Sequence, residues 1–267
     1  MKPDISIIMP IFNGERWLND SIGSIYKTIL KTSWELLLCD DGSTDHTRAA
    51  IKNKYLHDKR VNLVFEDEIN RGAAIARNIM INQAQADTIM ILDCDNILCD
   101  GVVDQMYQSI NTETSVVSPE KIQYFTDPKN IDPTDCWDFA YLNGKCDKQD
   151  MVRSFNVPPC SGNYMYRKEV WEKVDGYHKK DIQETWGFGF RHIFAGYPIK
   201  ILPGTQYLHR FLRDGYYMRL PKCEMDLACW QLLRDHDRWF DDDSEKHLLD
   251  IKPRGKDAIL SGKIKLK

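Results

Sequence analysis

The five residues from Leu92 to Asn96 constrain the fold of this 267-residue chain more than any other stretch. An apolar run that begins at Thr88 leads directly into two aspartates, Asp93 and Asp95. A short run of branched apolar residues predicts a buried strand, and in open α/β sheets ligands bind at the carboxyl ends of the strands. Two carboxylates at such an end can share one hard cation, because Mg²⁺ and Mn²⁺ take oxygen ligands from carboxylates and substrate phosphates. Taken alone, the same pattern also occurs in loops with solvated acids.

Strand-like and helix-like segments alternate through the first hundred residues. Strands are predicted at 5–9, 35–39, 61–65 and 88–92, and helices at about 17–30, after Thr44 and at about 73–85. This alternation predicts parallel βαβ units with right-handed crossovers, and therefore a nucleotide-binding α/β half. The chain has neither a Gly-x-Gly-x-x-Gly motif nor a Gly-Lys-Ser/Thr phosphate loop, which argues against dinucleotide-binding and P-loop proteins.

The second half of the chain has a less regular pattern. Helices are expected at about 102–110, from Lys168 onward, at 184–195 and at 221–240, and strands at 115–118, up to Arg167, at 199–202 and at 207–209. Residues 120–160 carry four prolines and many aromatic side chains, so we expect an irregular but ordered segment there. We predict one α/β domain over residues 1–215, with a nucleotide-binding half at 1–100 and a second half at 101–215, followed by a helical, basic extension at 216–267.

The composition argues against several classes of protein. The chain has 36 basic and 40 acidic residues, a net charge of −4, so it lacks the bulk positive charge of a nucleic-acid-binding protein. No apolar run approaches the roughly 18–20 residues that span a bilayer, and the N-terminus lacks a signal-peptide pattern. The eight cysteines form no Cys-x-x-Cys pair, as is typical of free thiols in a reducing compartment. We expect a soluble, cytoplasmic protein with no transmembrane segment.

Several motifs, taken together, resemble one enzyme family. Four of them occur in order in the first half, at residues 6–14 (SIIMPIFNG), 40–45 (DDGSTD), 70–78 (NRGAAIARN) and 92–96 (LDCDN). Three more follow in the second half, at residues 161–167 (SGNYMYR), 174–177 (VDGY) and 184–191 (ETWGFGFR). Over residues 4–212 the chain resembles a family 2 glycosyltransferase with the GT-A fold. The resemblance implies a Rossmann-like domain with a mainly parallel central sheet. It also implies that residues 1–100 bind a nucleotide-sugar donor and that residues 101–215 form an acceptor-binding half.

The resemblance also implies roles for individual residues in donor binding. It places Pro10 and Phe12 against the base of a UDP-linked donor, and Asp41 where its carboxylate can accept a hydrogen bond from the uracil imide. It places Arg77 near the nucleotide and Asp93 near the ribose. For Arg77, an ordinary arginine on the surface of a helix is the alternative.

The same resemblance implies a metal site. Asp95 matches the family's metal ligand, and His209 matches a late histidine that completes the metal shell in many GT-A enzymes. The expected cofactor is Mn²⁺ or Mg²⁺, which would stabilise the leaving nucleotide. A structural histidine remains the alternative for His209.

The resemblance further implies an inverting reaction, in which a carboxylate removes the proton from an acceptor hydroxyl. Thr185 occupies the position of the family's catalytic aspartate, and threonine is not a base at neutral pH. Glu184, directly before it, is the first candidate for the base, and Asp181 is the second.

Two other classes of protein remain open. One is a non-catalytic protein that binds sugar nucleotides or glycans, which Thr185 favours. The other is a sugar-nucleotide nucleotidyltransferase, which would need a Gly-rich phosphate loop where this chain has Pro10 to Gly14. The sequence identifies neither the sugar nor the acceptor hydroxyl, which can belong to a glycan, a lipid-linked molecule, a protein or a nucleic acid.

Overall fold

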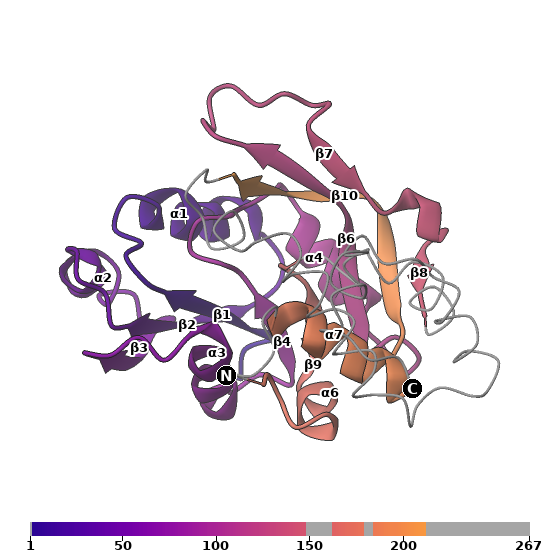
Figure 1. The fold of residues 1–267 in the computed structure, drawn as a ribbon, viewed down its shortest axis with the longest axis horizontal. Coiled ribbons are helices and arrows are strands. Elements are labelled where there is room, and N and C mark those ends of the chain that lie inside the picture. Colours follow the sequence, from indigo (N-terminus) through magenta and orange to yellow (C-terminus); the bar gives the residue numbers. More distant parts are fainter. Residues whose placement is uncertain (1, 148–161, 179–183, 212–267) are drawn as a thin grey trace, which may run out of the picture.

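The computed structural model describes residues 2–147, 162–178 and 184–211 (Figure 1). The predicted extension at 216–267 and the second base candidate, Asp181, therefore lie outside the described residues. The domain boundaries drawn from the sequence stay predictions.

The first half of the chain forms the expected parallel sheet. Its elements are β1 (Ile5–Ile11), α1 (Leu18–Thr28), β2 (Trp34–Asp41), α2 (Thr47–Lys54), β3 (Val61–Asp67), α3 (Ala73–Gln83) and β4 (Thr88–Ile91). Strand β1 pairs in parallel with β2 and with β4, and β2 pairs in parallel with β3. Because parallel strands share a direction, β1, β2 and β4 have their carboxyl ends at the same edge of the sheet.

The second half extends the same sheet. Its elements are β5 (Ile97–Leu98), α4 (Val102–Ser109), β6 (Val116–Phe125), β7 (Cys136–Asp138), the 3₁₀ helix η1 (Ala140–Leu142), β8 (Lys145–Cys146), β9 (Met165–Arg167), α6 (Lys168–Lys173), α7 (Glu184–Phe194) and β10 (Ile199–Arg210). The strand order along the sheet is β3-β2-β1-β4-β9-β6-β10-β5, with β7 beside β6 and β8 beside β10. Strand β9 runs antiparallel between β4 and β6, so it joins the two halves.

Two strands are longer than the sequence predicted. Strand β6 continues to Phe125, into the segment expected to be irregular, and β10 is one strand where two were expected. The two strands pair in parallel, and a shift of register between Leu202 and Gln206 accommodates the Pro203-Gly204 break. A proline within a strand is tolerated at such a bulge.

Helices cover both faces of the sheet, and alternate residues of each strand face opposite layers. One core combines Ile8 and Ile91 of the sheet with buried side chains of α3, α6 and α7. The other combines Ile7 and Met90 with buried side chains of α1, α2 and α4. Helices α3 and α7 therefore lie on the same face of the sheet. Within the described ranges, no helix has the length and apolarity needed to cross a membrane.

Candidate active site

The carboxyl end of β2 carries two adjacent aspartates that face different surroundings. Asp41 is buried, and its two carboxylate oxygens accept hydrogen bonds from the backbone N–H groups of Arg71 at 2.9 Å and Gly72 at 2.8 Å. These contacts fix the carboxylate beside the turn that precedes α3. A carboxylate oxygen accepts more than one hydrogen bond, so Asp41 retains capacity for a ligand N–H.

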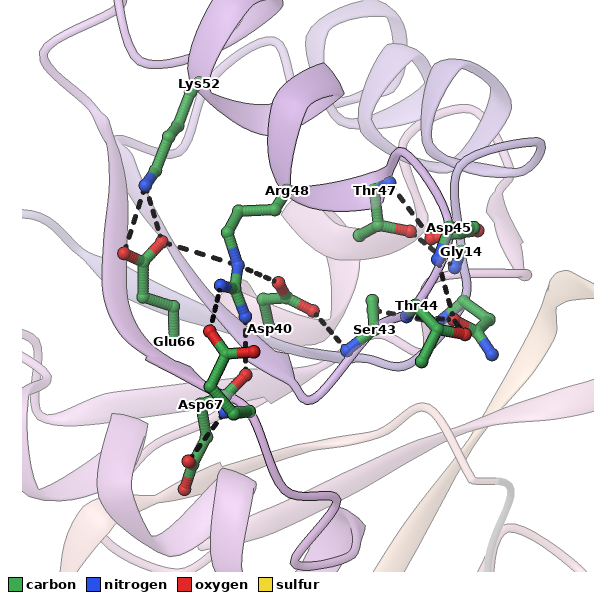
Figure 2. Close-up of polar contacts among 12 residues, drawn as sticks. Gly14, Asp40, Ser43, Thr44, Asp45, Thr47, Arg48, Lys52, Glu66 and Asp67 are labelled. Carbon is green, nitrogen blue, oxygen red and sulfur yellow. Dashed lines mark hydrogen bonds and ion pairs between the residues drawn. The ribbon is translucent and has the colours of Figure 1, made fainter.

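Asp40, in contrast, holds the local structure together (Figure 2). Its fully buried carboxylate accepts hydrogen bonds from Arg48 Nε of α2 at 2.8 Å and from the backbone N–H of Ser43 at 3.1 Å. Ser43 Oγ in turn accepts a hydrogen bond from the backbone of Asn13, whose side-chain oxygen accepts one from the backbone of Thr44. The loops that follow β1 and β2 are thus hydrogen-bonded to each other. The sequence did not reveal this structural role of Asp40.

The loop after β1 presents an accessible aromatic ring at this edge. Phe12 is 49% exposed, whereas Ile11 is buried and Pro10 is half-buried. Gly14 lies close to the Asp93–Asp95 turn, because a Cβ atom at this position would stand 3.2 Å from Cys94 Sγ. The loop after β1 and the turn after β4 therefore pack against each other.

Arg77 of α3 is buried and joins two carboxylates. Its side chain is 3% exposed, and it donates through Nη1 to Glu184 Oε1 at 2.6 Å and through Nη2 to Asp93 Oδ1 at 2.8 Å. Burial alone would lower the pKa of Arg77, but Glu184 and Asp93 outweigh it and raise the pKa well above its ordinary value. This burial rules out the alternative of an arginine on a helix surface.

Asp93 is oriented from three sides. Besides the ion pair to Arg77, its backbone N–H donates to Asn163 Oδ1 at 2.8 Å. The hydroxyl of Ser21 donates to the carbonyl oxygen of Asp93 at 3.4 Å. Asn163 belongs to the motif at 161–167, but its contact with Asp93 depends on the position of β9 beside β4, which the sequence did not predict.

Asp95 and His209 lie on neighbouring segments. Strand β10 runs antiparallel to β5, and Arg210 donates from its backbone to Asn96 Oδ1 and from Nε to the carbonyl oxygen of Asp95, both at 3.1 Å. Burial, and then the charge of Asp93, raise the pKa of Asp95 to about 7. Burial lowers the pKa of His209, and its Nδ1 is buried with no hydrogen-bond partner among the described residues.

The side-chain chemistry of these two residues is compatible with the ligation of a divalent cation. A cation would compensate the repulsion between the carboxylates of Asp93 and Asp95. A neutral imidazole whose nitrogen has no hydrogen-bond partner can serve as a metal ligand. In the part of the chain that the structure describes, no group of three or more His, Cys, Asp or Glu side chains is placed to hold a metal. Donor phosphates and water would have to supply the other ligands, as is common for Mg²⁺.

The start of α7 carries the candidate base. Glu184 is the first residue of the helix, and its side chain is 18% exposed. Thr185, the next residue, is buried. Glu184 therefore reaches Arg77, and through it Asp93, from the second half of the chain.

Comparison with solved structures defines the class of fold. The chain superimposes on TarS from S. aureus in complex with UDP-GlcNAc with a TM-score of 0.69 and 16% identity, covering 92% of this chain and 70% of that one. It superimposes on the mannosyltransferase PcManGT from Pyrobaculum calidifontis, in complex with GDP-Man and Mn²⁺, with a TM-score of 0.67 and 16% identity, covering 93% and 68% of the two chains. The fold is thus that of the GT-A glycosyltransferases, as the sequence predicted.

The family follows from the sequence match. The model of the family "Glycosyl transferase family 2" matches residues 6–175, and the chain belongs to this family. A curated relative is the UDP-Glc:alpha-D-GlcNAc-diphosphoundecaprenol beta-1,3-glucosyltransferase WfgD of Escherichia coli. It is 34% identical over an alignment of 138 residues, which covers 45% of this chain and 53% of the relative. The matched region spans between 37% and 53% of the length of the first curated relatives.

Proposed function

We propose that this protein transfers a sugar from a UDP-linked donor to an acceptor hydroxyl, with inversion at the anomeric carbon and with a divalent cation. The observation that carries the proposal is the convergence of acidic side chains at one edge of the sheet. Asp41 and Asp93 come from the first half of the chain, and Glu184 comes from the second half and reaches Asp93 through Arg77. Family membership supports the same reaction class.

In this proposal the nucleotide lies over the loops after β1 and β2. The exposed ring of Phe12 stacks on the base with Pro10 beside it, and Asp41 accepts a hydrogen bond from the imide N–H of uracil. Asp93 accepts hydrogen bonds from the ribose through lone pairs that Arg77 leaves free. The UDP-GlcNAc bound by TarS supports a uridine donor, whereas the GDP-Man bound by PcManGT makes guanosine the alternative to be tested.

Asp95 and His209 are the residues that would hold Mn²⁺ or Mg²⁺. The cation would neutralise charge on the diphosphate as the glycosidic bond breaks. The raised pKa of Asp95 supports this assignment, as does the buried Nδ1 of His209, which has no hydrogen-bond partner among the described residues. The Mn²⁺ bound by PcManGT supports it from a protein of the same fold.

Glu184 is the proposed general base, with Asp181 as the second candidate. A carboxylate accepts the proton of the acceptor hydroxyl while the oxygen attacks the anomeric carbon on the face opposite the diphosphate. The new carbon–oxygen bond forms, the bond to the diphosphate breaks, and the nucleoside diphosphate leaves. Glu184 is partly exposed, as a group that meets an acceptor must be.

The proposed acceptor is a hydroxyl of a lipid-linked sugar. WfgD, as its name states, acts on GlcNAc-diphosphoundecaprenol. The match to WfgD covers 45% of this chain. A free glycan or a protein hydroxyl would be the alternatives if lipid-linked acceptors fail.

A panel of UDP-, GDP- and dTDP-sugars tests the donor and the metal together. Purified protein is incubated with each donor, with Mn²⁺ or with EDTA, and the released nucleotide is measured. We expect release from a UDP-sugar with Mn²⁺ and little with EDTA. Release only from a GDP- or dTDP-sugar would contradict the uridine assignment, and equal release with EDTA would contradict the metal assignment.

One observation favours a second candidate function. Thr185 is buried at the position of the family's catalytic aspartate, so the chain is also compatible with a protein that binds the donor without turnover. UDP binding with no nucleotide release from any donor, even with lipid-linked acceptors present, would support this alternative.

A further inference from the structure

The ion pairs of Arg77 connect the two halves of the candidate site. One carboxylate, Asp93, follows β4 in the first half, and the other, Glu184, begins α7 in the second half, 107 positions after Arg77 in the chain. Helix α3 carries Arg77 on the face of the sheet that α7 also covers. No other described side chain forms ion pairs with both an aspartate of the 92–96 turn and a residue of α7.

The burial of Arg77 requires both partners. A guanidinium that is 3% exposed has lost nearly all contact with water, and a buried charge is tolerated only when it is paired and hydrogen-bonded. The ring of Tyr177, whose centre lies 5.4 Å from Arg77 Cζ, covers the group further. Since the surroundings fix the guanidinium, it fixes the carboxylates in turn.

Arginine suits this task because its donors form a planar fork. Nη1 bonds to Glu184 and Nη2 to Asp93, so one rigid group determines the positions of both carboxylates relative to each other. A lysine has one nitrogen on a flexible stem, and it would satisfy one carboxylate well or both poorly. The position thus calls for an arginine rather than for any cation.

We propose that Arg77 is a positioning residue that sets Glu184 at a fixed place relative to the donor, by bridging it to Asp93. Nη1 and Nη2 of its buried guanidinium bond to these two carboxylates, whereas Nε has no hydrogen-bond partner among the described residues. Because Asn163 also holds the backbone of Asp93, we expect the loss of Arg77 to affect the position of Glu184 more than that of Asp93. This inference rests on the proposed function and adds to it a residue that controls the rate of transfer more than the binding of the donor.

The test combines Arg77→Met and Arg77→Lys with Glu184→Gln. Nucleotide release and the Kd for UDP are measured for the wild type, each single variant and the double variants that include Glu184→Gln. Arg167→Met serves as the control, because Arg167 lies on β9 opposite Thr88, at the end of β4 remote from Asp93, and pairs with exposed Glu169. Thermal unfolding of each variant reports on folding.

We expect Arg77→Met to lower kcat about 100-fold in the wild-type background, the order of loss that follows from misplacing a catalytic group by about 1 Å. In the Glu184→Gln background the same change should lower kcat by less than about threefold, because Arg77 then has no base to position. The Kd for UDP should change by less than about threefold, and Arg77→Lys should recover part of the lost rate. If Arg77→Met unfolds the protein, Arg77→Lys supplies the same comparison in both backgrounds.

Two results would overturn the inference and leave the proposed function standing. One is an equal loss of kcat from the Arg77 variants in both backgrounds. The other is a rise in the Kd for UDP as large as the loss of rate, which would mean that Arg77 binds the nucleotide directly. If the wild type releases nucleotide from no donor, the proposed function fails, and the inference about transfer fails with it.

Discussion

Asp40 and Asp41 are adjacent aspartates with different surroundings, because their side chains point to opposite faces of strand β2. Successive side chains of a strand point to opposite faces, so Asp40 meets Arg48 of α2 while Asp41 meets the turn at Arg71 and Gly72. The sequence identified the pair as a cluster of acids at a strand end. The sequence could not show which of the two carboxylates stabilises the local structure, because that depends on where α2 and the turn before α3 pack.

Asparagine substitutions should separate these roles. Asp41→Asn should raise the Kd for UDP about tenfold or more, because the imide of uracil would lose a charged acceptor. Asp40→Asn should lower the free energy of unfolding by about 1–3 kcal/mol, because it weakens the pairing of Arg48 and the backbone bond to Ser43. Calorimetry and urea unfolding measure the two effects. Equal weakening of UDP binding by both variants would contradict this division.

Gly42, the next residue, is required by close backbone contact. Its φ is +80°, and a Cβ atom there would stand 2.6 Å from the backbone nitrogen of Asn70. Gly42→Ala should therefore destabilise the protein by more than the roughly 1 kcal/mol of a positive φ alone. Gly196 is the matched control, since its φ is +95° and nothing lies within 4 Å of the added Cβ atom. Urea unfolding that shows equal losses for Gly42→Ala and Gly196→Ala would contradict the clash.

At the scale of elements, most of the regular structure followed from local pattern. The four parallel strands and α1, α3, α4 and α7 lie within a few residues of their predicted positions. The predicted strand bounds were wrong where pairing with a distant strand determines the bounds of a strand. Strand β10 runs across Pro203-Gly204 because β6 pairs along it on both sides of the break, and the two-residue strand β5 exists only because β10 lies beside it.

Helix α7 contains a histidine whose burial should make stability depend on pH. His192 is fully buried, its Nδ1 lies 2.9 Å from the carbonyl oxygen of Tyr197, and burial lowers its pKa to about 4. The unfolded chain binds a proton at His192 below about pH 6.5, whereas the folded protein does so only near pH 4, so stability falls as the pH is lowered through this window. The loss should reach about 3 kcal/mol.

His192→Asn provides the check, because the asparagine amide can still donate to the Tyr197 carbonyl but does not titrate. Urea unfolding of both proteins at several pH values between 7 and 4.5 gives the two slopes. The variant should lose less stability over this range than the wild type. Parallel curves would show that His192 does not carry the pH dependence.

At the scale of the whole molecule, the fold brings side chains from both halves of the chain to one edge of the sheet. The motifs predicted the parallel strands of the first half and the family, because these follow from residues that lie close together in the chain. The bridge through Arg77 could not be predicted, because it joins residues 107 positions apart across α3 and α7. In the proposed site, Asp93, Asp95 and Glu184 receive their roles from this arrangement.

The most direct test of the account is to follow a UDP-sugar by proton NMR with the wild type, Mn²⁺ and water or an added acceptor. The account predicts that the anomeric signal of the donor decays and that a signal of the opposite anomeric configuration appears first, before any free sugar mutarotates. Glu184→Gln should slow this decay by about 100-fold or more. A first product that retains the configuration would contradict the inverting mechanism, and a donor signal that never decays would contradict glycosyl transfer.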